Sequence, residues 1–231
     1  MNFFGIPQKD NLPDAPVRVV PVPYEATVSF GKGAAFGPDA IIRASVAIEE
    51  YDADADFDLT TAGGIHTADP VHLTCAGPAE AMKELSEAAG RMAAPGRLTV
   101  FLGGEHSITP AIVRSLVNRG VKPLVVHVDA HHDLRAAFEG SPWSHACAAR
   151  RLVEMGLPIL QLGQRSTSRE DVQAIREFGV SVLYGRDLAD GLSDGGAELI
   201  RSLVDGRTVY ITCLLYTSPS PRDRTRSRMP S

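Results

Sequence analysis

The stretch VVHVDAHHDL, residues Val125 to Leu134, decides the fold of this chain. It begins with apolar and mostly β-branched residues, which are typical of a buried strand. Acids and imidazoles then fill four of the five positions from Asp129 to Asp133. Because an unpaired carboxylate is costly to bury or loses its charge, a positive charge must lie at the end of this strand.

Predicted strands and helices alternate along the chain, and the strands are continuous apolar runs. This pattern is typical of α/β proteins in which helices cover both faces of a parallel sheet. Ligands of such sheets bind outside the carboxyl ends of the strands, where residues 129–133 fall. We predict strands at 17–24, 97–104, 122–129, 157–166, 180–185 and 207–212, and helices at 78–93, 109–120, 144–156, 169–179 and 195–206.

The composition is that of an ordinary globular protein, with 44% of the 231 residues hydrophobic and 22% charged. A net charge of −5 argues against a nucleic-acid partner. No apolar run approaches the roughly 20 residues of a membrane span, and the first residues do not have the pattern of a signal peptide. The cysteines Cys75, Cys147 and Cys213 are scattered and odd in number, which suits a reducing compartment. We therefore predict a cytoplasmic protein without a membrane or nucleic-acid partner.

Asp129, His131 and Asp133 have the spacing that places side chains on one face of an extended chain. If the extended conformation persists past the strand, these side chains converge at its carboxyl end, where a divalent cation would supply the missing positive charge. A polar, solvated loop is the alternative interpretation. His132 has the opposite parity and is predicted to point elsewhere. His127 lies deeper and is interpreted as a hydrogen-bonded core histidine.

A second group of candidates follows the preceding strand, where His106 lies in FLGGEHSIT. Gly103 and Gly104 allow a tight turn and a close backbone approach. A dinucleotide-binding loop is the alternative, although the G-x-G-x-x-G spacing is absent. By strand adjacency, His106 is predicted at the same sheet edge as the Asp–His–Asp group. His145, at a predicted helix start, is a candidate for proton transfer near a metal, and a structural histidine beside Trp143 is the alternative.

FLGGEHSIT and VDAHHDL resemble the first two metal motifs of the ureohydrolases, the arginase/agmatinase family. PVPYEATVSFGKGAAFGPDAIIRAS and QLGQRS also resemble family segments, and DLRAAFEGSPWSHACAARR is similar to the corresponding loop of agmatinases rather than arginases. The resemblance covers residues 17–212 and implies an arginase-like, three-layer α/β/α fold with a parallel sheet. It also implies a site in which two manganese ions share a bridging hydroxide that attacks a guanidinium carbon.

The resemblance implies that His106 and Asp133 bind one Mn²⁺, that His131 binds the other and that Asp129 bridges them, while His145 matches the histidine assigned to proton transfer. Carboxylate and imidazole ligands without thiolate suit manganese. Two ions about 3.5–4 Å apart can lower the pKa of a shared water to about 7, and an acid-rich pocket attracts a cationic guanidino substrate. We therefore predict a manganese-dependent amidinohydrolase of polyamine metabolism that splits agmatine into putrescine and urea, and a homo-oligomer as in the family.

The chain departs from the family pattern near its last residues. The third metal motif of the family has two aspartates, which alignment places where this chain has Leu214 and Tyr216. We therefore expect residues 1–212 to form the N-terminal two-thirds of an arginase-like domain, truncated before its C-terminal third. Residues 213–231 are then expected to be a non-family tail, either a disordered basic segment or a translated cloning sequence. Because two ligands of the family set are replaced, we expect weak metal binding and no activity.

Several alternatives stay open at this point. Related substrates such as arginine, guanidinobutyrate, guanidinopropionate or formiminoglutamate would make the protein an arginase, a guanidinobutyrase or a formiminoglutamase. A metallophosphoesterase also uses D-x-H, but its later G-D and G-N-H-E motifs are not found in the sequence. The motifs of zinc deacetylases differ from GGEHS. A metal-free, non-catalytic pseudoenzyme is the remaining interpretation.

Overall fold

The computed structural model describes residues 1–29, 31–58, 63–74 and 76–214. The chain divides into two compact units. The first unit contains residues 1–115 and 143–145, and the second contains residues 116–142 and the chain from 146 onward. Each unit has a parallel sheet of its own, so the predicted α/β class with parallel strands is confirmed.

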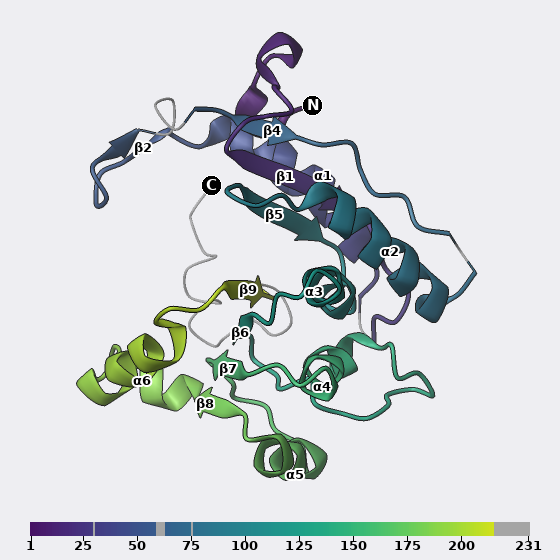
Figure 1. Cartoon of the computed structure of the whole chain (residues 1–231), viewed down its shortest axis with the longest axis vertical. Helices are drawn as coiled ribbons and strands as arrows, with labels where there is room; N and C mark the ends of the chain where they lie inside the picture. The colour runs from purple at the N-terminus through teal and green to yellow at the C-terminus, as the bar shows by residue number, and fades with distance from the viewer. Residues whose placement is uncertain (30, 59–62, 75, 215–231) are drawn as a thin grey trace, which may run out of the picture. The chain divides into compact units, whose positions relative to one another are not determined.

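The first unit is built on a parallel sheet with the strand order β4-β1-β5 (Figure 1). Its strands are β1 (Val17–Val22), β4 (Ile65–Thr67) and β5 (Leu98–Gly103). Val19, Val20 and Val22 of the central strand are buried, as expected for a strand with neighbours on both edges and helices nearby. β4 was not predicted, because three residues are too few to show a periodic pattern.

The helix predicted at residues 78–93 is present in the first unit as α2 (Pro78–Met92). In α2, Ala81, Leu85, Ala88 and Ala89 form a buried face, and Pro78 occupies the first turn, where a missing N–H costs nothing. The α-helices are α1 (Gly37–Ala44), α2 (Pro78–Met92) and α3 (Ile108–Val117), and the 3₁₀ helices are η1 (Phe3–Gly5), η2 (Gln8–Asp10), η3 (Ala34–Phe36) and η4 (Ser45–Ala47).

A short antiparallel hairpin of the first unit, β2 (Tyr51–Asp52) and β3 (Phe57–Asp58), was also not predicted. In Figure 1 it extends away from the sheet of that unit. Tyr51 and Phe57 are exposed on it. The surrounding residues are rich in aspartate and glutamate, a composition that gives little strand signal.

The second unit is a parallel sheet with the strand order β8-β7-β6-β9 and helices between its strands. Its strands are β6 (Leu124–Val128), β7 (Ile159–Leu162), β8 (Ser181–Leu183) and β9 (Val209–Cys213). Its helices are α4 (Ala148–Glu154), α5 (Arg169–Phe178) and α6 (Asp194–Val204), with a 3₁₀ turn at η7 (Gly185–Leu188). The 3₁₀ turn η6 (His145–Cys147) begins at His145, which belongs to the first unit. Ser168 caps α5 in a reciprocal capping box with Asp171, and Gly179 ends the helix in the left-handed conformation.

The two faces of β6 have different roles. Leu124 and Val126 pack with Leu160 of β7 into a core that is covered by Ile200 and Leu203 of α6. His127 has the opposite parity and lies opposite Gln161 of β7 in the strand register. Figure 1 shows α6 and α4 on opposite sides of this row of strands. The polar pair therefore lies on the face of the sheet away from α6.

The strand order of the second unit reverses at β6. The chain moves outward from β6 to β7 and β8, and β9 then returns to the other edge of β6. Ligands of open α/β sheets bind beside such a reversal, outside the carboxyl ends of the strands. The topology therefore places the residues that follow β6 at the position where a ligand is expected.

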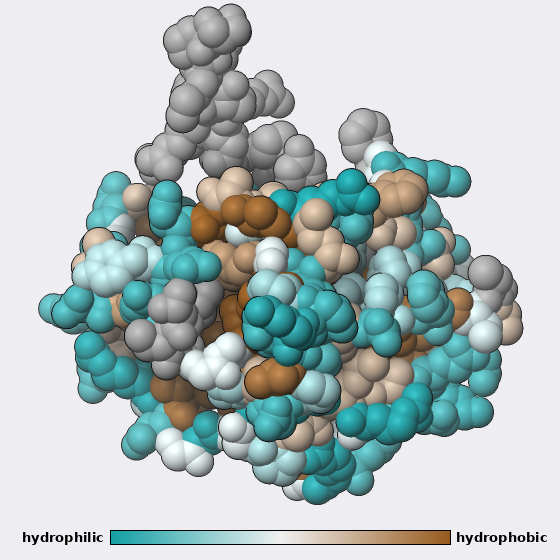
Figure 2. All heavy atoms as spheres, turned by 90° about the horizontal axis from the view of Figure 1, so that it is seen from above, coloured by the Kyte–Doolittle hydropathy of each residue, from teal (hydrophilic) through white to brown (hydrophobic). Residues whose placement is uncertain are grey.

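None of the helices in the described ranges is both long enough and apolar enough to cross a lipid bilayer. On the face shown in Figure 2, hydrophobic residues form small brown areas among hydrophilic ones. Residues 215–231, which hold most of the predicted non-family tail, lie outside the described residues. Cys213 is the last residue of β9. The predicted domain boundary at 212 stays a prediction.

Candidate metal centre

The candidate metal centre of the second unit begins where β6 ends. The chain bends at Asp129 and Ala130, directly after the strand. Asp129 is buried, and its Oδ1 accepts the backbone N–H of His131 at 3.0 Å. The loop after β7 supports this bend, because the backbone N–H groups of Arg165 and Ser166 both donate to the carbonyl of Ala130, at 2.9 and 3.0 Å. The end of the segment QLGQRS thus holds the bend within VDAHHDL by backbone hydrogen bonds.

Three buried side chains gather at this strand end. Atoms of His127, Asp129 and Asp133 that could bind a metal all lie within 4.8 Å of one another. The extended conformation assumed from the sequence does not persist, because Asp133 has a φ of +53°. A left-handed conformation is uncommon for a residue with a Cβ and is often found at functional sites. Asp133 therefore approaches Asp129 through a turn and not through strand parity.

His131 lies at the margin of this cluster. Its Nδ1 is 3.6 Å from Oδ1 of Asp129, and 40% of its side chain is exposed. The hydrogen bond with Asp129, together with the charge of Asp133, raises the pKa of His131 against the opposing effect of burial. Because a metal binds the neutral imidazole, protons compete with a metal for this side chain as the pH falls through the raised pKa.

The strand on the other side of β6 brings position 214 to the same end of the sheet. Cys213 of β9 pairs with Val128 of β6, and the backbone N–H of Leu214 donates to the carbonyl of Val128 at 3.0 Å. Leu214 therefore lies beside the peptide that joins Val128 to Asp129, and its side chain has no ligand atom. Burial and the charge of Asp129 raise the pKa of the Cys213 thiol, so that it stays protonated at neutral pH. Tyr216 lies outside the described residues.

The first unit contains the other predicted motif, in the loop after β5. His106 is buried there. A Cβ added to Gly104 would lie 2.0 Å from the carbonyl oxygen of Tyr24, so the predicted close backbone approach is present and only glycine permits it. His106 belongs to the first unit and the Asp–His–Asp group belongs to the second, and their meeting at one metal site stays a prediction.

Glu105, next to His106, is a buried carboxylate that was not singled out from the sequence. Its Oε2 accepts the backbone N–H groups of Ala26 and Thr27 at 2.8 and 2.7 Å. Its Oε1 accepts the hydroxyls of Thr27 and Ser107 at 2.8 and 2.6 Å. Burial, and then the charge of Glu105, raises the pKa of Tyr24 to about 12. Glu105 thus joins the loop after β1 to the loop after β5.

Thr27 connects this network to His145, the predicted proton-transfer residue. The hydroxyl of Thr27 accepts the backbone N–H of His145 at 3.0 Å and lies 3.4 Å from Nδ1 of its ring. Because that hydroxyl donates its one hydrogen to Glu105, it can only accept from the ring. Nδ1 of His145 also lies 3.4 Å from the hydroxyl of Ser144, which can donate to it or accept from it. The role of His145 in proton transfer stays a prediction.

Glu105→Gln is expected to destabilise the first unit by about 3 kcal/mol, because an amide group replaces one acceptor oxygen that now receives two hydrogen bonds. Urea unfolding of the metal-free chain, followed by circular dichroism, measures this loss. Glu87→Gln is the matched control, since Glu87 is exposed on α2 and its replacement is expected to change stability by less than about 0.5 kcal/mol. Equal stabilities of the two variants would contradict the anchoring role of Glu105.

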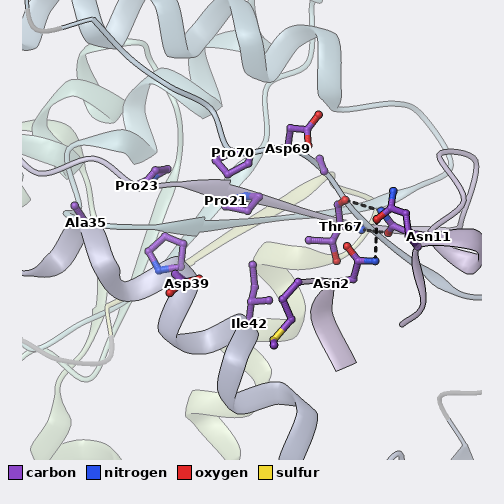
Figure 3. Close-up of a pocket in the computed structure, with 14 residues that line it drawn as sticks. Asn2, Asn11, Pro21, Pro23, Ala35, Asp39, Ile42, Thr67, Asp69 and Pro70 are labelled. Carbon is purple, nitrogen blue, oxygen red and sulfur yellow. Dashed lines mark hydrogen bonds between the residues drawn. The ribbon is translucent and has the colours of Figure 1, made fainter. Parts of the chain in front are cut away.

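A cavity of about 310 Å³ lies elsewhere in the first unit (Figure 3). Its wall includes Asn11 and Thr67, which pair with each other: the Asn11 amide donates to the Thr67 carbonyl at 3.0 Å, and Asn11 Oδ1 accepts the Thr67 backbone N–H at 2.7 Å. None of the predicted metal-binding residues lines this cavity. It is therefore separate from the candidate metal centre.

The side chains at the end of β6 fit a hard divalent cation. Asp129 and Asp133 offer carboxylate oxygens and His131 offers an imidazole nitrogen, which are donors that suit manganese. Two buried carboxylates at this separation repel each other unless a positive charge compensates them. The His/Asp cluster of the second unit is therefore suited to hold a metal ion.

Comparisons with known proteins show the family of this chain. The sequence model of the arginase family matches residues 15–214. An N(1)-aminopropylagmatine ureohydrolase from Synechocystis sp. is 39% identical over 183 residues, which cover 77% of this chain and 60% of the relative. An agmatinase from Pyrococcus horikoshii is 33% identical over 214 residues, which cover 90% of this chain and 71% of the relative.

A solved structure is similar as well. The proclavaminate amidino hydrolase from Streptomyces clavuligerus aligns with a TM-score of 0.77 at 28% identity, over 91% of this chain and 72% of that chain. The present chain spans 60% of the length of its Synechocystis relative. The match therefore supports the α/β fold with parallel sheets.

Proposed function

Since this chain belongs to the arginase family, we propose that it is a manganese-dependent amidinohydrolase chain that acts on a linear guanidino compound, with agmatine as the first candidate. The observation that supports this proposal best is the buried His/Asp cluster at the end of β6, beside the strand reversal. The cytoplasmic compartment stays a prediction from the cysteine usage.

In this proposal Asp129, Asp133 and His131 hold the metal in the second unit, and His106 of the first unit contributes the remaining imidazole. Divalent ions bound there would lower the pKa of a water so that a nucleophile is available near neutral pH. The acidic side chains attract the guanidinium group of the substrate. The hydrogen bonds from Glu105 through Thr27 hold His145 for transfer of a proton to the leaving amine.

N(1)-aminopropylagmatine is the second candidate substrate, because the relative with 39% identity is named for that activity. Both candidates are linear cations with a terminal guanidinium group, so the metal centre alone does not separate them. The difference lies in the far end of the substrate, which carries an additional aminopropyl group. Direct comparison of the two compounds therefore decides between these candidates.

We expect the chain as it stands to release no urea, because Leu214 supplies no ligand where the family pattern has an aspartate. Urea release from agmatine in millimolar Mn²⁺ would overturn this expectation.

The proposed function is tested with the Leu214→Asp variant loaded with Mn²⁺, to which agmatine, N(1)-aminopropylagmatine or putrescine is added. The guanidino compounds are expected to change the electron paramagnetic resonance spectrum of bound Mn²⁺. Putrescine lacks the guanidinium group and is the control; identical spectra with agmatine and putrescine would contradict the proposal.

A further inference from the structure

A chain of hydrogen bonds runs from the candidate metal centre into the interior of the second unit. Nε2 of His127 lies 3.3 Å from Oδ2 of Asp129. Gln161, the register partner of His127 on β7, places its Nε2 3.1 Å from Nδ1 of His127. Oε1 of Gln161 contacts Nδ1 of His132, and Nε2 of His132 lies 3.0 Å from the hydroxyl of Thr167. His127, Gln161 and His132 are all at most 1% exposed.

One backbone carbonyl sets the direction of these hydrogen bonds. Nε2 of Gln161 lies 2.8 Å from the carbonyl oxygen of His132, and a carbonyl oxygen can only accept. The amide nitrogen of Gln161 must therefore be at this position, and its second hydrogen donates to Nδ1 of His127. Nδ1 of His127 is then bare, so the neutral ring carries its proton on Nε2 and donates it to Asp129.

The same carbonyl also fixes the far end of the chain of hydrogen bonds. Oε1 of Gln161 has to accept from Nδ1–H of His132, which leaves Nε2 of His132 to accept from the hydroxyl of Thr167. The ring of His132 packs edge-on against Tyr184, with ring centroids 5.9 Å apart. His132 is thereby held on both nitrogens and on its ring edge, and it cannot rotate without breaking these contacts.

We propose that His127 is a positioning residue for Asp129 and not a metal ligand, and that Gln161 holds it in the tautomer with the proton on Nε2. The proposal rests on the proposed function only where it takes Asp129 as a ligand. His127 lies close enough to the carboxylates to be counted with them, but both of its ring nitrogens are engaged, one by Gln161 and one by Asp129. A carboxylate has about four lone-pair sites, so the hydrogen bonds that Asp129 accepts from His127 at Oδ2 and from the backbone of His131 at Oδ1 are compatible with a role as a metal ligand.

The energetic effect of this arrangement is expected to be large for a residue outside the ligand set. Partners that orient metal ligands typically change metal affinity by about 10–100-fold. The hydrogen bonds lie in the interior, where low polarizability strengthens them and makes an unpaired group costly. Loss of Gln161 would free the ring of His127 to change tautomer or orientation, and Asp129 would lose its fixed donor.

The tautomer is measured by ¹⁵N nuclear magnetic resonance of the histidine rings in the metal-free protein, which does not depend on any metal or activity. In the unsubstituted chain, the proton of His127 is expected on Nε2 and that of His132 on Nδ1. Gln161→Glu replaces the amide donor by a carboxylate, so Nδ1 of His127 is expected to gain a proton that the new carboxylate accepts, while Nε2–H still donates to Asp129. A purely structural glutamine would not produce this change.

The effect on the metal is measured as Mn²⁺ affinity in the Leu214→Asp background. Gln161→Met is expected to weaken binding by about 10-fold, whereas Gln173→Met, at an exposed glutamine of α5, leaves it unchanged. A proton on Nδ1 of His127 in the unsubstituted chain, or equal Mn²⁺ affinities of the two methionine variants, would overturn the proposal. If no variant binds Mn²⁺, the result contradicts the proposed function. The tautomer of His127 then decides by itself whether Gln161 orients the ring of His127.

Discussion

Leu214→Asp is expected to raise the affinity of this chain for Mn²⁺ on the order of 100-fold, which corresponds to about 2.7 kcal/mol. The backbone of Leu214 is hydrogen-bonded to Val128, the residue before Asp129. A carboxylate introduced at position 214 would therefore be attached to the backbone at the end of β9, beside the end of β6. The affinity of oxygen-donor sites depends strongly on the number of charged ligands, and this variant adds one. Titration of the metal-free protein with Mn²⁺, followed by the resonance signal of the free ion, measures the change.

Leu214→Asn is the matched control for this gain. Asparagine has nearly the same shape as aspartate and removes the same apolar side chain, but it brings no charge. It is expected to raise the Mn²⁺ affinity by less than about 10-fold, because a neutral carbonyl oxygen binds the ion more weakly than a carboxylate. Equal gains from the two variants, or no gain from either, would show that position 214 does not face the metal.

Asp129→Asn, in the Leu214→Asp background, is expected to lower Mn²⁺ affinity on the order of 100-fold. Asp129 is the carboxylate that both His131 and His127 contact, so it occupies the middle of the cluster. Asparagine retains one oxygen and keeps the hydrogen bond to the backbone of His131, so the bend after β6 is expected to persist. Calorimetric titration with Mn²⁺ measures the loss.

The stability of the metal-free protein separates a lost ligand from a lost fold. Asp129→Asn removes one of two neighbouring buried carboxylates, so it relieves their repulsion when no metal is present, but it also places an amide N–H group opposite Nε2–H of His127. Because these two effects oppose each other, the variant is expected to unfold at a urea concentration close to that of its parent, while it binds Mn²⁺ less tightly. Asp190→Asn changes the charge of the second unit equally at an exposed position and is expected to leave both quantities unchanged. A variant that loses stability and affinity together would contradict a ligand role.

The parallel arrangement of the strands and the chemistry at the end of β6 could be anticipated from the sequence for physical reasons. Apolar runs between amphipathic helices leave few choices other than parallel strands. Asp129 follows such a run directly. Prediction of the strand was therefore enough to predict that Asp129 lies at its carboxyl end. His127 was interpreted as a buried, hydrogen-bonded histidine, and the structure shows it 1% exposed with Gln161 and Asp129 as partners.

Other features depend on contacts that a single segment does not reveal. Asp133 approaches Asp129 through a left-handed turn, which the alternation rule for strands cannot anticipate. The role of Glu105 depends on Ala26 and Thr27, which are distant in sequence and form no motif with it. Gln161 did give a signal, since a glutamine within the apolar run ILQL is unusual in a buried strand, but its partner could be identified only from the register of β6 and β7.

Crystals of the Leu214→Asp variant grown with MnCl₂ provide the most direct test, through an anomalous difference map recorded near the manganese absorption edge. The account predicts a peak at the end of β6, within bonding distance of the carboxylates of Asp129 and Asp133, with the His127 ring outside the coordination shell. A map without a peak at this position, or a peak that these two carboxylates do not contact, would contradict it.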